Sequence, residues 1–112
     1  MPEDIVTKDE IRNKRDAKVH DHLAQYAPVW IVDEVYLLEE EAVQFNVVFM
    51  HPTAGPNGKP SWVNRRYRYD GFNNVLYHKG QHRIDEDTAV EITETEPYIF
   101  TNVADVPNSY GG

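Results

Sequence analysis

The chain has 112 residues, of which 40% are hydrophobic and 12% aromatic, and its formal net charge is −8. This length suits one domain with one core, the aromatic content argues against a disordered chain, and the negative charge argues against generic binding to duplex DNA. The sequence contains no cysteine, which excludes disulfides and thiolate sites, and it shows neither a membrane span nor a secretory signal, so we expect a cytoplasmic protein without membrane contact.

A helix is predicted over residues 7–26. Thr7 and Glu10 match the T-x-x-E pattern of a capping box, in which each residue satisfies a free backbone amide at the start of the helix. Only half of the residues on the helical stripe are apolar, so we expect the helix to lie on a surface or to reach across to a partner subunit. Pro28 ends it, because the residue before a proline is pushed out of the helical conformation.

Antiparallel strands are predicted for most of the segment 29–103. The first two strands, 29–38 and 42–50, are rich in β-branched and aromatic residues, and the second alternates apolar and polar side chains. Only the three glutamates 39–41 separate them, so a hairpin is the natural connection.

The middle of the chain is predicted to form a second hairpin. A loop rich in proline and glycine spans 51–60 and is followed by strands at 62–69 and 75–79, which an Asp-Gly turn connects. Gly80 is expected to end the second of these strands and to leave 82–84 as a short additional strand.

The last segments are harder to assign. Residues 85–96 combine a helix-capping aspartate and early acids with β-branched residues in alternation, and we favour a strand. Residues 98–103 suit an edge strand, and 104–112 a loose tail. We therefore predict one α+β domain over 1–112, in which a helix precedes a meander of four to six antiparallel strands. An SH3-like or OB-like open barrel is the curled alternative for this sheet.

Five histidines raise the question of a metal site. His20 and His22 are two residues apart on the predicted helix, so their rings point about 200° apart and cannot share one ion. A site drawn from His51, His78 and His82 is the remaining option, and three solvent-facing histidines are the competing interpretation. We expect no metal and no cofactor.

Catalytic motifs are missing from the sequence. Ser61 and Ser109 are the only serines, neither lies in a G-x-S-x-G setting, and no glycine-rich phosphate loop is present. Asp33 and Glu34 are neighbours in a predicted strand, so they point to opposite faces. An inward-facing one would have a shifted pKa or would pair with an arginine across the sheet. We predict no catalytic residues.

The segment 62–83 gathers basic and aromatic side chains in an otherwise acidic chain. Residues 61–84 carry five bases and one acid, whereas 85–112 carry seven acids and no Lys or Arg. Arginine binds carboxylates and phosphates and stacks on aromatic rings. The competing interpretation is ordinary sheet packing, with the charge neutralised by the acidic C-terminal region. The candidate binding residues are Trp62, Arg65, Arg66, Tyr67, Arg68, Tyr69, Tyr77 and Arg83.

These observations predict a small non-enzymatic binding or accessory protein. Its contact surface is the hairpin 62–83, and its partner is another protein or a second copy of the chain, since Trp, Tyr and Arg dominate protein interfaces. A binder of single-stranded nucleic acid or of a small anionic ligand is the alternative. A small enzyme with a pocket in the curled sheet is the second alternative.

Overall fold

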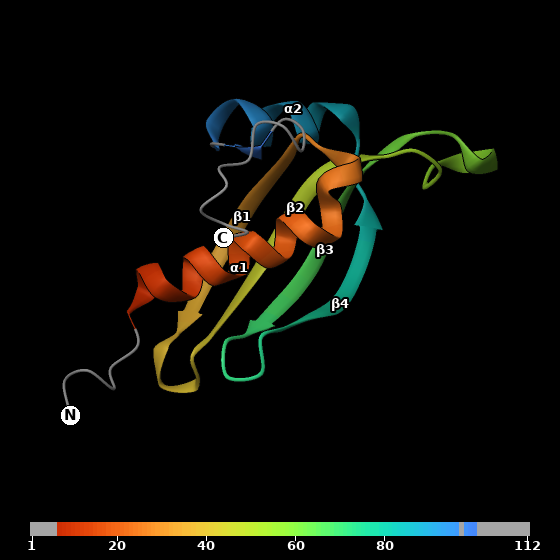
Figure 1. Ribbon diagram of the computed structural model, residues 1–112. Helices are drawn as coiled ribbons and strands as arrows, with labels where there is room; N and C mark the ends of the chain where they lie inside the picture. Colours follow the sequence, from red (N-terminus) through yellow and green to blue (C-terminus); the bar gives the residue numbers. More distant parts are fainter. Residues whose placement is uncertain (1–6, 97, 101–112) are drawn as a thin grey trace.

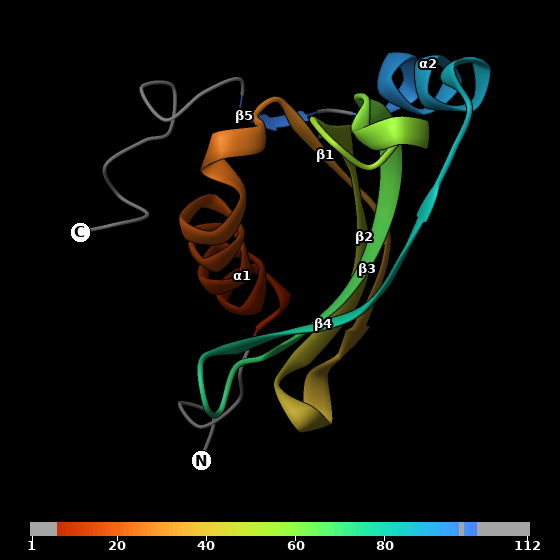
Figure 2. The same ribbon diagram turned by 90° about the vertical axis from the view of Figure 1, so that its right-hand side faces the viewer.

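A computed structural model of the protein describes residues 7–96 and the backbone of 98–100. Helix α1 (Lys8–Leu23) lies across one face of an antiparallel sheet, and helix α2 (Glu86–Thr95) lies on the other side of the sheet (Figure 1 and Figure 2). The strand order is β4-β3-β2-β1-β5. The strands are β1 (Val29–Leu37), β2 (Ala42–His51), β3 (Ser61–Asp70), β4 (Val75–Arg83) and β5 (Tyr98–Phe100).

The predicted α+β class is confirmed, with a helix followed by an antiparallel meander. The first four strands pair with their neighbours in sequence, whereas β5 returns to the opposite edge and pairs with β1. The described sheet is open, with β4 at one edge and β5 at the other, so the barrel alternative is not confirmed. No helix among residues 7–96 is long and apolar enough to cross a membrane.

Helix α1 begins as its sequence predicts. The Thr7 hydroxyl accepts a hydrogen bond from the Glu10 amide at 3.1 Å, which satisfies one of the free donors of the first turn. The helix ends at Leu23, and a 3₁₀ turn (Ala24–Tyr26) completes the segment that we predicted as helical. The buried stripe is thin because Arg15 takes a place on it between Ile11 and Val19.

The core lies between α1 and the sheet. Alternate residues of β2 point toward the helix, because side chains of a strand alternate between its two faces. The buried apolar residues of this layer come from α1 and from three strands, β1, β2 and β3. They include Ile11, Val19, Leu23, Val29, Val43, Phe45, Val47, Phe49, Val63, Tyr67 and Tyr69.

The preference for a strand at 85–96 is wrong. The segment forms α2, and the Asp85 carboxylate accepts a hydrogen bond from the Thr88 amide at 2.7 Å. This cap and the acids of the first turn stabilise the start of the helix, which the β-branched residues only weaken. Ala89 is fully buried, so the helix packs through a narrow face.

The predicted break at Gly80 is also wrong. β4 continues to Arg83, and 82–84 is not a separate strand. Arg66 pairs with Gly80 and Tyr67 with His78, so Lys79 is an extra residue in a bulge. Gly80 has a φ of +149°, a conformation that L side chains rarely adopt, and this lets the strand bend without ending.

The edge strand predicted at 98–103 is present over Tyr98–Phe100. Its remaining residues, 101–103, and the tail predicted at 104–112 lie outside the described residues.

Candidate interaction surface

The strand β3 places its side chains on two different surfaces. Those of Val63, Arg65, Tyr67 and Tyr69 face α1, as do their partners in β2. Tyr67 and Tyr69 are 1% and 0% exposed, so both rings lie in the core. These two tyrosines were predicted as binding residues from the sequence. We leave them out of the candidate surface because a partner cannot reach them.

Arg65 belongs to the same inward-facing row. Its Nε donates to Oε1 of Gln81 at 2.6 Å, and its Nη1 donates to the Tyr67 hydroxyl at 2.8 Å. Its guanidinium carbon lies 5.1 Å from the centre of the Phe49 ring. These contacts hold the Arg65 guanidinium within the fold. Arg65 therefore fits the interpretation of 62–83 as ordinary sheet packing better than a role in binding.

Arg66 and Arg68 lie on the outer face of β3. Arg66 is exposed and hydrogen-bonds to the side-chain oxygens of Gln44 and Asn46, at 3.1 and 3.4 Å. Arg68 forms an ion pair with Glu40 at 2.8 Å, with 59% of the Glu40 side chain exposed. Within residues 7–96 no ion pair joins Arg66 to a carboxylate. The acids of α2 therefore do not neutralise this part of the hairpin.

The strand register aligns the outer side chains in rows that cross the sheet. One row contains Val35, Gln44, Arg68 and Tyr77, which are paired from β1 to β4. Val35 is 53% exposed and Tyr77 44% exposed, so apolar and aromatic surface lies at both ends of a polar, basic centre.

The adjoining rows extend this surface. A bulge between Val32 and Val35 in β1, where Asp33 has a φ of 56°, turns Val35 outward. We use the name outer patch for seven residues on the outer face of these rows. They are Val35, Leu37, Gln44, Asn46, Arg66, Arg68 and Tyr77.

The outer face is covered by α2 at the end of the sheet that carries Trp30 and Trp62. The rings of Trp30 and Trp62 lie 5.9 Å apart, and the Ile84 amide donates to the Trp62 carbonyl at 3.0 Å just before α2 begins. Figure 2 shows α2 on this side of the sheet, and Val48 beside Trp30 is fully buried. Trp62 therefore contributes to the packing at this end rather than to the outer patch.

The eight predicted binding residues are thus divided between environments. Arg66, Arg68 and Tyr77 lie together on the outer patch. Arg83 is exposed at the end of β4, where it pairs with the inward-facing Val63. The sequence reasoning missed Val35, Leu37, Gln44 and Asn46, because these lie on the two preceding strands and become neighbours only through the register. The alternation of apolar and polar residues along β2 is the sequence pattern that indicates that Gln44 and Asn46 face outward.

An ion cluster lies under α1. Arg15, which is 1% exposed, donates from Nε to Asp16 and from Nη2 to Glu34, both at 2.7 Å, and its guanidinium lies 4.8 Å from the centre of the Phe45 ring. The Tyr36 hydroxyl donates to the same Glu34 oxygen at 2.8 Å. Glu34 does pair with an arginine, but the prediction that this arginine lies across the sheet is wrong, because Arg15 belongs to α1.

The electrostatics of this cluster indicate a structural role. Burial raises the pKa of Asp16, and the charge of Arg15 offsets only part of that effect. Burial alone would raise the pKa of Glu34, but hydrogen bonds from Tyr36 and Arg15 bring the pKa below its usual value. Burial and the hydrogen bond to Glu34 raise the pKa of Tyr36 to about 12. A carboxylate that is held ionised by two donors is a poor general base at neutral pH.

The histidines have other contacts. The His51 ring stacks on Tyr26 with 5.2 Å between ring centres, and its Nδ1 accepts from the Thr53 amide. The His78 ring lies 5.6 Å from that of Tyr67. Among the residues that the structure describes, no three His, Asp or Glu side chains are grouped so that they could hold a metal ion.

A comparison of the chain with protein-family models, with curated proteins and with solved structures finds no match. The functional argument therefore rests on the surface itself.

Proposed function

We propose that the protein acts by binding, and that the outer patch receives an acidic segment of another protein. The observation that carries the proposal is the row that joins exposed Val35 and Tyr77 to Arg68, beside an Arg66 that has no carboxylate partner among residues 7–96. Tyrosine and arginine are the residue types that contribute most to binding energy at interfaces.

The charges of the outer patch and of the whole chain favour an acidic protein segment over a nucleic acid as the partner. The planar fork of an arginine binds a carboxylate through two parallel hydrogen bonds, and the two outer arginines lie on neighbouring rows of one strand. A nucleic acid would have to approach a chain whose net charge is −8, and long-range repulsion of phosphate opposes this. A short acidic segment presents carboxylates without that extended charge.

The protein itself supplies a suitable probe. Residues 85–96 contain six acids and no base, and they comprise α2 and its two caps, exposed except for the buried Ala89 and the half-buried Ile92 and Thr93. A synthetic peptide with this sequence tests whether the outer patch accepts an acidic helix. If a second copy of the chain is the partner, the same segment of that copy is the natural occupant.

The experiment measures the binding of this peptide to the wild-type protein and to a variant with Arg66→Glu and Arg68→Glu. We expect the double variant to bind at least about tenfold more weakly, because two interface arginines are reversed in charge. The control carries Lys14→Glu and Lys59→Glu, two exposed lysines outside the patch, and changes the net charge equally. Circular dichroism of all three proteins checks that the fold is retained.

Three outcomes contradict the proposal: no binding by the wild-type protein, equal weakening in the control, or no weakening in the double variant. Sedimentation at two concentrations shows whether the protein self-associates through the same arginines. Tight binding of oligothymidylate, with an affinity that falls steeply and log-linearly with salt, would favour the single-strand nucleic-acid alternative instead. We also propose that the protein works in the reducing cytoplasm, which a chain without cysteine suits.

A further inference from the structure

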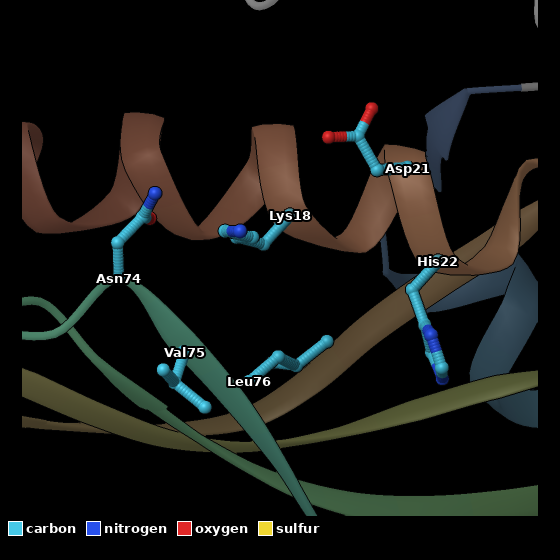
Figure 3. Close-up of a pocket in the computed structure, with 6 residues that line it drawn as sticks. All are labelled: Lys18, Asp21, His22, Asn74, Val75 and Leu76. Atoms are coloured by element: carbon cyan, nitrogen blue, oxygen red, sulfur yellow. The ribbon is translucent and has the colours of Figure 1, made fainter.

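A hollow lies between α1 and the start of β4, away from the outer patch. Its volume is about 340 Å³, which is near the lower end of the range for small-molecule sites. Three lining residues come from α1 and three from the turn and first residues of β4, as Figure 3 shows. They are Lys18, Asp21, His22, Asn74, Val75 and Leu76.

The polar groups at this hollow favour an anion. The Lys18 ammonium forms no ion pair or hydrogen bond with any residue of 7–96. In Figure 3 the Lys18 side chain extends toward Asn74, whereas the Asp21 carboxylate points away from Leu76. The one acid among the lining residues therefore does not offset the charge of Lys18 inside the hollow.

Asn74 adds directed donors. Its Oδ1 accepts a hydrogen bond from the Tyr69 hydroxyl at 2.7 Å, which fixes the amide so that its nitrogen remains available to donate. Asn74 has a φ of 55°, a conformation that asparagine tolerates better than most residues, so the backbone of the turn holds the amide at this position. The ammonium and the amide nitrogen thus form a pair of donors.

The remaining lining is apolar or uncharged. Leu76 is half-buried and packs against the core, and the Val75 side chain lies beside it in Figure 3. The His22 ring meets the edge of Tyr67, with 5.8 Å between ring centres. Burial and the charges of Arg65 and His78 lower the pKa of His22, which favours a neutral imidazole. The hollow therefore combines one cation with an apolar side.

We propose that this hollow binds a small monocarboxylate with a short apolar chain. The carboxylate accepts hydrogen bonds from Lys18 and Asn74, and the chain lies against Leu76. Charge-assisted hydrogen bonds are about twice as strong as neutral ones, so the acid is preferred over a neutral molecule of the same shape. The site is separate from the outer patch, and its failure would leave the proposed binding of an acidic segment unaffected.

The test uses hexanoate as the probe and follows the backbone amide signals of the labelled protein by NMR. We expect saturable shifts confined to α1 around Lys18 and to the residues 74–76. In Lys18→Met the affinity falls at least about tenfold, because a hydrogen bond to a charged group is lost. Lys18→Arg retains binding within about twofold, because it keeps the charge and donors.

Two controls make the result specific. Lys14→Met removes an exposed lysine one turn earlier on the same helix and leaves the affinity unchanged. Hexan-1-ol, which has the same chain without the charge, binds at least about tenfold more weakly than hexanoate. The proposal is overturned if hexanoate causes no saturable shift, if the shifted signals lie elsewhere, or if hexan-1-ol binds as tightly. Equal affinity of Lys18→Met and the wild-type protein also overturns it.

Discussion

Replacement of Arg15 by methionine tests how the ion cluster under α1 contributes to stability. Methionine keeps much of the length and apolar character of the side chain, so the change mainly removes the charge and the hydrogen bonds to Asp16 and Glu34. Only 6% of the Asp16 side chain is exposed, and its carboxylate would then be buried without a partner. The Glu34 side chain is 35% exposed and can be hydrated instead.

The magnitude follows from this difference in burial. Removal of one partner from a buried ion pair costs roughly 3–5 kcal/mol, because the remaining charge is left without compensation. With a denaturant slope of roughly 2 kcal/mol per molar, the midpoint of urea unfolding should fall by roughly 1.5–2.5 M. Such a loss is a large part of the roughly 5–15 kcal/mol that stabilises a typical domain.

Urea titrations followed by circular dichroism measure this effect. The control is Arg12→Met, because Arg12 pairs with Asp9 at the same 2.7 Å while 44% and 73% of the two side chains are exposed. An exposed pair contributes at most about 1 kcal/mol, so the control should unfold close to the wild-type midpoint. A double variant, Arg15→Met with Asp16→Leu, should recover part of the loss, because no buried charge remains.

The reasoning is refuted if Arg15→Met unfolds no earlier than the Arg12→Met control. It is also refuted if the double variant is no more stable than the Arg15→Met variant, since the cost would then come from lost packing on Phe45 rather than from the uncompensated Asp16 charge.

The remaining predictions concern pH and backbone packing. The pKa of Tyr36 is raised from 10.0 to about 12, so its contribution to stability is fully present below pH 10 and is lost as the pH rises through about 12. In chemical unfolding between pH 9 and 12, Tyr36→Phe should therefore lose less stability than the wild-type protein; equal losses would contradict this. Gly71→Ala should cost roughly 1–3 kcal/mol, because the new Cβ would lie 2.5 Å from the Glu41 carbonyl oxygen. Gly58→Ala should cost less when the thermal unfolding of the two variants is compared, because nothing lies within 4 Å of its new Cβ and only the φ of +73° opposes the change.

The strand pattern of β3 could be predicted from the sequence, but not which of its faces was buried. Alternation correctly separates the row of Tyr67 and Tyr69 from the row of Arg66 and Arg68. Both rows contain an aromatic residue and an arginine, so local pattern gives no clear preference. Packing against α1 decides it, because the tyrosine row completes an apolar layer with β2.

Long-range contacts account for what the sequence could not show. The helical periodicity does not show that Arg15 is buried or which acid it meets, because Glu34 lies 19 residues away at the bulge in β1. The segment that forms α2 contains both a capping aspartate, which favours a helix, and alternating β-branched residues, which favour a strand. In the structure the Asp85 carboxylate caps a helix. Gly80 looked like a strand end because a bulge needs a partner strand before it can be recognised.

The bulge in β4 affects how readily this edge of the sheet can pair with a strand of another molecule. β4 is an edge of the described sheet, and all but one of its residues are exposed, so its backbone could serve as a template for a strand from another molecule. The extra Lys79 and the unusual conformation of Gly80 interrupt the regular spacing of its amides and carbonyls and place a charge at the same point. Segments that stack into fibrils have high β-propensity, low net charge and few glycines. The kinked edge discourages such growth, and it leaves the broad side of the sheet, where we propose that binding occurs, free of competing strand pairing.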